Sequence, residues 1–358
     1  MTAGSMEGAH RIAVIPGDGI GRETVPEAVR VLDHAAKRGG FRLDYEPFDW
    51  GCEYYARHGR MMDADGLERL AGFDAILLGA VGAPEVPDHV SLWGLLIPIR
   101  RHFRQYVNLR PIRLFEGVAG PLTGRTPAEI DFIIVRENNE GEYSKIGGSL
   151  YDRTDEEIAV QVSTFTRRGT ERVVRYALRL AEKRDGRLAS ATKSNGIRHT
   201  MPFWDRVVRE LAPEFPGVAV SEHHMDALAA MLVLAPYKFD VIVASNLFGD
   251  ILSDLGAAIA GSIGIAPSAN LNPEREFPSM FEPVHGSAPD IAGKGIANPI
   301  GQIWSGAMML DHLGHGDAAE TVLEGIATML QSTDLRTPDL GGHARTSEIT
   351  DAVLSGMP

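Results

Sequence analysis

The feature of this sequence that most limits its possible folds is the alternation of short apolar segments with helical segments. Amphipathic stretches at 168–185 and 201–212 are predicted to be helices. Apolar segments of strand length lie before, between and after them, at 11–16, 42–48, 74–82, 131–137, 188–193, 218–223 and 239–246. Strands that alternate with helices usually pair in parallel within a covered sheet. The predicted fold class is therefore α/β with a mostly parallel sheet.

The last third of the chain is less regular. Residues 251–265 are predicted to form a helix of small apolar residues that ends in glycines. The stretch 266–300 is rich in Pro, Gly, Ser and Asn and shows little periodicity, so we expect a long loop, and long loops are usually functional. Helices are predicted at 300–313 and 317–330, before a polar tail.

Length, charge and cysteine content narrow the class of protein. A chain of 358 residues exceeds the usual size of one hydrophobic core, so two lobes are expected. The net charge of -13 disfavours partners such as nucleic acid or an anionic membrane surface. Cys52 is the only cysteine, which excludes an intrachain disulfide, and no apolar run reaches the ~18 residues of a membrane span. We expect a cytoplasmic protein.

A glycine-rich turn, GDGIG at 17–21, follows the first apolar segment. The dinucleotide-binding fingerprint G-x-G-x-x-G would require a glycine where Arg22 stands, so that motif is not met. The turn is instead predicted to be a tight strand-to-helix connection that needs the backbone freedom of glycine. Asp18 stays open as a ligand contact.

Arginines gather in a predicted helix and its exit at 98–113: Arg100, Arg101, Arg104, Arg110 and Arg113. Arg100 and Arg104 would share one helix face. Such a cluster is commonly ion-paired surface, and the alternative is a clamp for carboxylates. Arg136 favours the clamp, because it follows a buried strand, where an unpaired guanidinium would be costly.

Asp250 and Asp254 lie four residues apart in an otherwise apolar predicted helix, hence on one face. No lysine or arginine lies four residues from either, so a hard divalent metal between the two carboxylates is favoured. A helix N-terminus that attracts acids would explain Asp250 but not Asp254. Asp226, which opens the apolar segment 227–235, is a third candidate ligand or a simple helix cap.

Two residues beside apolar strands could move protons. Lys193 and Tyr143 are candidates for this role, as a lysine of lowered pKa and a positioned phenol. The later segment 282–298 combines glycine, proline and hydrogen-bonding side chains in an irregular loop suited to gripping a ligand. A structured Ω-loop without function is the alternative.

Six ordered blocks carry a family resemblance: VIPGDGIG, NLRP, VREN, ATKSNG, SNLFGDILSDL and EPVHGSAPDIAGKGIANP. Together they resemble the β-decarboxylating dehydrogenase family of isocitrate and 3-isopropylmalate dehydrogenases over nearly the whole chain. The segment 87–115 is most similar to the tartrate dehydrogenase and D-malate dehydrogenase branch. The resemblance implies a two-lobed, isopropylmalate-dehydrogenase-like fold with a cleft between the lobes. The first lobe would be 1–105 and 262–358, with the cofactor loop, and the second 106–261, with the metal site and dimer interface.

The resemblance also implies roles for the candidate residues. Arg100, Arg110 and Arg136 would bind the substrate carboxylates. Tyr143, Lys193 and Asp226 would be catalytic, and Mn2+ or Mg2+ would be bound by Asp250, Asp254 and an Asp226 from the partner subunit, with K+ open as a further cation. Because Lys193 would also come from the partner, the active site would be shared within a homodimer.

The cofactor implied by the resemblance is NAD. It would contact Glu282, His285, Gly286, Ser287, Ala288, Asp290 and Asn298. An acid at Asp290 favours free ribose hydroxyls and repels a 2'-phosphate. Trp93 departs from the isopropylmalate enzymes, which carry an acidic residue there, so details near it do not transfer from that branch.

The implied activity is metal-dependent oxidation and β-decarboxylation of a small 2-hydroxy dicarboxylic acid by NAD. Tartrate and D-malate are the favoured substrates, and D-malate would give pyruvate and carbon dioxide. A 3-isopropylmalate dehydrogenase is the alternative, with an apolar pocket near Leu95, Leu96 and Ile97. A non-catalytic regulatory subunit is disfavoured by the retention of every residue assigned above.

Overall fold

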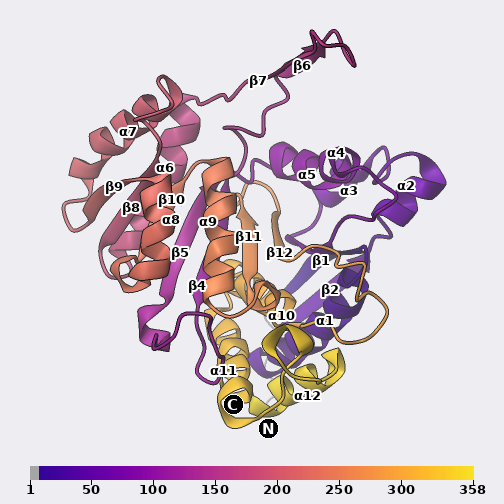
Figure 1. Ribbon diagram of the computed structural model, residues 1–358. Coiled ribbons are helices and arrows are strands. Elements are labelled where there is room, and N and C mark those ends of the chain that lie inside the picture. Colours follow the sequence, from indigo (N-terminus) through magenta and orange to yellow (C-terminus); the bar gives the residue numbers. More distant parts are fainter. Residues whose placement is uncertain (1–7) are drawn as a thin grey trace. The chain divides into compact units, whose positions relative to one another are not determined.

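The computed structural model describes residues 8–358 and divides into two compact units (Figure 1). Unit 1 holds the chain up to Gln105, Arg113–Pro127 and Ala257–Pro358, and unit 2 holds Tyr106–Ile112 and Ala128–Gly256. The segment 113–127, which we had assigned to the second lobe, thus belongs to unit 1. The chain re-enters unit 1 at Ala257 rather than at residue 262.

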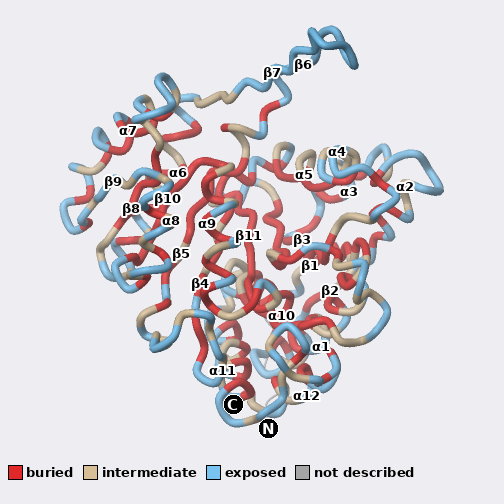
Figure 2. Tube along the Cα trace, in the orientation of Figure 1, coloured by how far each residue is buried: buried red, intermediate tan, exposed pale blue. Residues whose placement is uncertain are grey.

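The sheet of unit 1 has the strand order β2-β1-β3-β12-β11. Its strands are β1 (Ala9–Gly17), β2 (Arg42–Pro47), β3 (Ala75–Ala80), β11 (Pro267–Leu271) and β12 (Ser279–Pro283). The first four in spatial order pair in parallel, and β11 pairs antiparallel with β12. Every residue of β3 is buried, as expected of a parallel strand that is covered on both faces (Figure 2).

Helices cover the sheet of unit 1. The longer ones are α1 (Gly21–Gly39), α10 (Ile300–His312), α11 (Gly316–Ser332) and α12 (Thr346–Gly356). The shorter ones are α2 (Cys52–His58), α3 (Gly66–Leu70), α4 (Asp88–Ser91) and α5 (Ile97–His102). Helix α10 is buried along most of its length and packs on β11 and β12. No helix within residues 8–358 is long and apolar enough to cross a membrane.

Unit 2 has its own strands, in the order β4-β5-β10-β8-β9. They are β4 (Val107–Arg113), β5 (Asp131–Glu137), β8 (Arg187–Thr192), β9 (Ala219–His224) and β10 (Val241–Ala244). The last four in spatial order pair in parallel. Its helices are α6 (Arg167–Glu182), α7 (Thr200–Leu211), α8 (Met225–Leu234) and α9 (Asn246–Ile259). A hairpin of β6 (Gly147–Leu150) and β7 (Ile158–Gln161) extends away from the rest of unit 2 (Figure 1).

The predicted α/β class with mostly parallel strands is confirmed, but three local predictions were wrong. The stretch 266–300 contains β11 and β12, the polar tail contains α12, and Arg110 lies in β4 rather than in a helix. Strand β11 was missed because it buries polar side chains and so lacks an apolar pattern. Asn270, fully buried in β11, donates to Glu282 Oε1 at 2.8 Å.

A widened helical turn interrupts the helix that carries Arg100. Residues Leu92–Leu96, between α4 and α5, form a π-helix in which the Ile97 amide donates to the Leu92 carbonyl five residues back. Pro98 explains the interruption, because proline has no amide to donate and its ring clashes with the carbonyl four residues before it. The helix ends at His102, and Arg104 adopts a left-handed φ of 47°. The prediction that Arg100 and Arg104 share a helix face was therefore wrong.

The glycine turn is a tight strand-to-helix connection, as predicted. Gly17 and Gly19 have φ values of +69° and +52°, which favour glycine. A Cβ on Gly19 would lie 2.0 Å from the Ser287 carbonyl oxygen, and the Ile20 amide donates to that oxygen at 2.9 Å. The turn thus packs directly on the segment predicted to bind the cofactor.

Asp18 has a structural task in this turn. Its two carboxylate oxygens accept hydrogen bonds from the backbone amides of Cys52, at 2.8 Å, and Gly82, at 2.9 Å. The residue is 4% exposed. Both carboxylate oxygens therefore accept hydrogen bonds from the backbone. These contacts assign Asp18 a structural role and do not support a ligand contact.

We predict that Gly19→Ala destabilises the protein much more than Gly40→Ala. Both glycines have positive φ, but a Cβ on Gly40 meets no atom within 4 Å. Gly40→Ala should cost about 1 kcal/mol of unfolding free energy from backbone strain alone, and Gly19→Ala about 3 kcal/mol, because the clash with Ser287 is added. Urea unfolding of both variants measures the difference. Equal losses would contradict the packing described for the turn.

Candidate active site

Arg136 is buried at the carboxyl end of β5, where α9 holds its guanidinium. Its Nε and Nη2 donate to Asn246 Oδ1 at 3.0 and 2.7 Å, and its Nη1 donates to Asp250 Oδ1. Gly249 permits this approach, since a Cβ there would lie 2.6 Å from the Arg136 Cβ. The partners that a buried guanidinium requires are therefore supplied by the first turns of α9.

Asp250 collects three donors from three parts of unit 2. Besides Arg136, Arg110 Nη1 lies 3.1 Å from Oδ1, and the Tyr143 hydroxyl donates to Oδ2 at 2.9 Å. Arg110 Nη1 also lies 3.7 Å from Asp254 Oδ1. The structure thus brings together five of the residues singled out in the sequence, from β4, β5, the following loop and α9.

These contacts correct one step of the metal argument. The spacing along α9 favours a divalent metal between Asp250 and Asp254, because no lysine or arginine lies four residues from either. Arginines from β4 and β5 supply positive charge instead, which spacing along one helix cannot reveal. The two carboxylates remain hard oxygen donors on one face. In the described part of the chain, however, no group of three or more His, Cys, Asp or Glu side chains could hold a metal ion.

The electrostatic setting of this cluster favours protonated groups. Partial burial, followed by the negative charge of Asp250, raises the pKa of Tyr143, so its phenol stays a proton donor at neutral pH. Partial burial also raises the pKa of Asp254, although its side chain is more than half exposed; the charge of Arg110 opposes the rise and that of Asp250 adds to it. The cluster therefore holds a phenol able to give a proton beside two carboxylates.

Lys193 and Asp226 form a second group in unit 2. Lys193 follows β8, and Asp226 lies in the first turn of α8, directly after the neighbouring strand β9. Lys193 Nζ donates to Asp226 Oδ1 at 2.7 Å, and this hydrogen bond lowers the pKa of Asp226. No three His, Cys, Asp or Glu side chains among the described residues are placed to hold a metal ion. One chain therefore does not place Asp226 with Asp250 and Asp254 in a metal site.

Arg100 and Glu282 are direct partners in unit 1. Arg100 Nη2 donates to Glu282 Oε1 at 2.5 Å, and the two side chains are 10% and 8% exposed. The resemblance had assigned Arg100 to the substrate and Glu282 to the cofactor. Their pairing means that removal of either would leave a buried charge, which typically costs about 3–5 kcal/mol.

The segment that follows Glu282 has features of a ligand-binding loop. His285 is buried, its Nδ1 lies 3.0 Å from the Gly286 carbonyl oxygen, and its Nε2 has no hydrogen-bond partner among the described residues. Burial lowers the pKa of His285, so the ring is neutral. Ala288 has a left-handed φ of 40°, a strained conformation that is common at ligand sites. A buried ring nitrogen without a hydrogen-bond partner among the described residues and a strained backbone are both typical of a loop that binds a cofactor.

The far end of this loop is fixed by protein contacts. Asn298 donates to Asp339 Oδ2 at 3.0 Å and accepts from the Ile300 amide at 3.0 Å. Glu23, in the first turn of α1, accepts hydrogen bonds from the amides of Gly293 and Gly295. Sequence reasoning missed Glu23 and Asp339, because neither lies in a motif and each acts on a segment distant in sequence. Asp290 lies between the fixed ends and is exposed.

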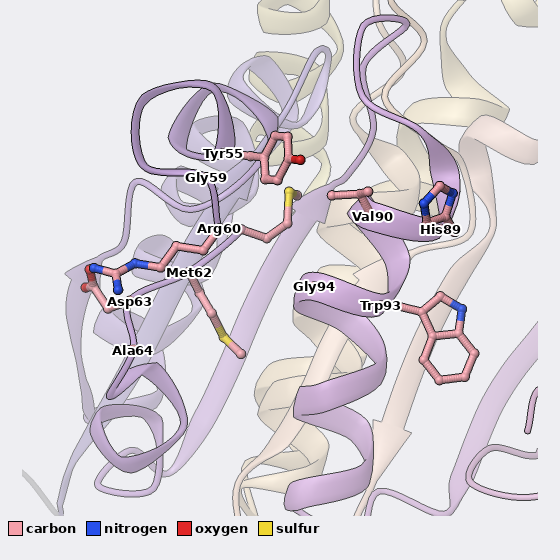
Figure 3. Close-up of a pocket in the computed structure, with 11 residues that line it drawn as sticks. Tyr55, Gly59, Arg60, Met62, Asp63, Ala64, His89, Val90, Trp93 and Gly94 are labelled. Atoms are coloured by element: carbon pink, nitrogen blue, oxygen red, sulfur yellow. The ribbon is translucent and has the colours of Figure 1, made fainter. Parts of the chain in front are cut away.

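A pocket of about 420 Å³ in unit 1 is separate from these groups. It lies between the loop 59–64 and the helical residues 89–94, and Trp93 lines one side. Figure 3 shows Arg60 extended toward Asp63, on the opposite side of the pocket from Trp93. The guanidinium of Arg101 lies 4.9 Å from the centre of the Trp93 ring. None of the residues that the resemblance assigned to the active site lines this pocket.

Comparison with known proteins gives a consistent family assignment. The family model described as isocitrate/isopropylmalate dehydrogenase matches residues 11–353. The D-malate dehydrogenase [decarboxylating] of Escherichia coli is 57% identical over 96% of this chain and 97% of its own length. The tartrate dehydrogenase/decarboxylase of Pseudomonas putida is 54% identical over 96% of each chain. The solved structure of isocitrate dehydrogenase from Methylococcus capsulatus aligns with a TM-score of 0.87 at 32% identity, over 97% of this chain and 99% of that one.

Glu137 is a buried acid that sequence reasoning did not single out. It follows Arg136, and its carboxylate accepts hydrogen bonds from the amides of Asn139 and Glu140. Burial raises the pKa of Glu137 to about 7, although those amides oppose the rise. The loop that carries Tyr143 starts at Glu137. With a pKa of about 7, Glu137 changes its charge near neutral pH.

We predict that Glu137 makes stability fall as pH rises from about 5 to about 8. A pKa of about 7, above the ordinary 4.5, means that the folded protein holds a proton that the unfolded chain releases in this range. Glu137→Gln removes this titration, so its stability relative to the parent should rise by on the order of 3 kcal/mol across the range. Urea unfolding at several pH values tests this, and curves that stay parallel would contradict it.

Proposed function

Because the chain belongs to the isocitrate/isopropylmalate dehydrogenase family, we propose that it oxidises a small 2-hydroxy dicarboxylate with NAD and then removes carbon dioxide. The proposed substrates are D-malate and tartrate, and the proposed metal is Mn2+ or Mg2+. Identity above 50% over nearly the full length of relatives named for these substrates supports the choice. A single cysteine, which cannot form an intrachain disulfide, is in keeping with a cytoplasmic location.

The observation that carries this proposal is the gathering of Arg110, Arg136 and Tyr143 around Asp250. Planar guanidinium groups suit the carboxylates of a diacid. The carboxylates of Asp250 and Asp254 suit a hard divalent cation, and a phenol kept protonated suits delivery of a proton. The reaction needs these three properties together.

The chain's own residues would bind the substrate and move its protons. When bound, the cation would supply polarisation of the oxygen on C2, and NAD would accept the hydride. Arg100, Arg110 and Arg136 would hold the two carboxylates, and Lys193 would accept the proton of the C2 hydroxyl. A 2-keto acid results, the bond to the β-carboxylate breaks, and its electron pair is left on an enolate. Tyr143 would then protonate C3, which gives pyruvate when D-malate is the substrate.

NAD is preferred over NADP in this proposal. The loop His285–Asn298 would bind it, with the exposed carboxylate of Asp290 toward the ribose hydroxyls. A negative charge there repels a 2'-phosphate. His285 supports the assignment, since its buried Nε2 has hydrogen-bonding capacity that no described residue uses.

We also propose a homodimer that shares its active sites. Each subunit would contribute Lys193 and Asp226 to the site around Asp250 of the other, and so complete a metal ligand set that the described residues of one chain do not form. Exposed apolar side chains support a partner surface. They lie on the hairpin and on α8: Ile146, Leu150, Ile158, Val160, Val233 and Leu234.

Oxidation of 3-isopropylmalate fits the structure less well. That substrate needs an apolar pocket for its alkyl group, which we had expected near Leu95, Leu96 and Ile97. Leu95 is fully buried and Leu96 is 8% exposed, and both pack in the hydrophobic core of unit 1. Leu95 and Leu96 are therefore committed to the core, which leaves the partly exposed Ile97 as the one of the three that could line a substrate pocket.

We predict that, with NAD as cofactor, D-malate and tartrate are oxidised faster than 3-isopropylmalate. We also predict that either diacid is oxidised faster with NAD than with NADP. The absorbance of the reduced cofactor at saturating Mn2+, with and without K+, measures each rate. The preference for a small diacid should be about tenfold or more in kcat/KM, the factor that one misfitting alkyl group commonly costs. A preference for 3-isopropylmalate would favour the alternative substrate.

Asp254→Asn should weaken Mn2+ binding by at least about tenfold while the fold is kept. Asp254 is the better test than Asp250, because its side chain is 57% exposed and its one ion-pair partner within residues 8–358 is Arg110, at 3.7 Å, whereas Asp250 anchors two arginines. Calorimetric titration with Mn2+ gives the affinity, and circular dichroism checks the fold. Asp311→Asn, on the exposed end of α10, serves as the matched control and should leave Mn2+ affinity unchanged. Unchanged affinity in Asp254→Asn would remove it from the ligand set.

A further inference from the structure

Glu142 connects two parts of the candidate active site. It directly precedes Tyr143, and its carboxylate reaches the start of α9. Glu142 Oε1 accepts a hydrogen bond from the Ser245 hydroxyl at 2.8 Å, and Oε2 accepts one from the Leu247 amide at 3.0 Å. Asp250 follows Leu247 by three residues, about one helical turn.

The start of α9 needs such a partner. The first amides of a helix have no acceptor within the helix, and a negative charge near them is favourable. Helix α9 has no acidic residue in its own first turn. Glu142 therefore supplies, from the loop after β5, the carboxylate that α9 lacks.

The two contacts of this loop lie side by side. Glu142 binds the Leu247 amide, and the next residue, Tyr143, binds the Asp250 carboxylate. Two adjacent loop residues thus contact positions one turn apart on the same helix. The loop also contacts α9 at Glu140, whose carbonyl accepts a hydrogen bond from Asn246 at 3.3 Å. The Glu142 contact is the one next to Tyr143, a residue that is 37% exposed, so its loss would loosen the backbone that carries the phenol.

We propose that Glu142 is a positioning residue that sets the Tyr143 hydroxyl against Asp250 by capping α9. The proposal rests on the proposed function, in which Tyr143 protonates carbon after carbon dioxide leaves. Loss of the cap should therefore impair the decarboxylation half of the reaction more than the oxidation half. Glu142 touches neither substrate nor cofactor in this role.

Glu140 in the same loop offers a matched control. Its carboxylate caps a different helix, because it accepts hydrogen bonds from the amide of Thr166, at 2.8 Å, and from its hydroxyl, at 2.6 Å, at the start of α6. Helix α6 carries none of the residues assigned to the active site. Removal of either glutamate thus costs one helix cap, and only the Glu142 cap belongs to the helix that carries Asp250.

The test compares Glu142→Ala, Glu142→Gln and Glu140→Ala in the full-length enzyme. For each, NADH formation from D-malate is measured beside decarboxylation of added oxaloacetate. Glu142→Ala should lower the ratio of decarboxylation to oxidation by about tenfold, a fraction of what a general acid contributes. Glu140→Ala should leave the ratio unchanged. Glu142→Gln should keep most of it, since its amide can still accept from Leu247 and donate to Ser245.

A second measurement does not depend on activity. With tyrosine labelled by 13C at Cζ, the Tyr143 signal is followed by NMR at one fixed pH, and Tyr143→Phe identifies it. The signal should move toward that of a solvent-exposed tyrosine in Glu142→Ala and stay in place in Glu140→Ala. The same ratio and the same Tyr143 signal in both alanine variants would overturn the role of Glu142. A parent enzyme inactive on both reactions, with the NMR shift still seen, would refute the proposed function but not the positioning.

Discussion

The pairing of two buried guanidinium groups with one carboxylate is the interaction on which the site in unit 2 depends. Arg110 and Arg136 arrive on separate strands, and both meet Asp250 on α9. Loss of the acid would leave two buried cations short of countercharge, at a typical cost of about 3–5 kcal/mol. The pairing therefore fixes α9 against the strands. The Tyr143 loop is then fixed in turn, through the Tyr143 hydroxyl and the Glu142 carboxylate.

Much of the fold could be predicted, because apolar periodicity is a local property of the sequence. The strands near 75, 132 and 188 and the helix at 300–312 follow from it directly. Strand β11 could not be predicted, since it buries Ser268 and Asn270. The Ser268 backbone amide donates to Ser305 Oγ, and the Asn270 side-chain amide donates to Glu282 Oε1. A pattern of apolar residues cannot register a strand whose buried side chains are polar.

The residues that meet at Asp250 could be named from the sequence, but their pairings could not. Motifs identified Arg110, Arg136, Tyr143 and Asp250 individually. Arginines, and not a metal alone, balance the charge of the aspartates. These contacts join residues more than 100 positions apart in the chain. Glu142 was missed for the same reason, because a helix cap supplied by a distant loop leaves no local signal.

The central claim is that the carboxylates next to Arg110 and Arg136 also hold the divalent cation of a decarboxylating dehydrogenase. Anomalous X-ray scattering from crystals grown with Mn2+ tests it most directly. The account predicts one strong peak per chain, about 2.2 Å from oxygens of Asp250 and Asp254, with Asp226 of a second subunit as a further ligand. A peak elsewhere, or none beside these carboxylates at saturating Mn2+, would contradict it.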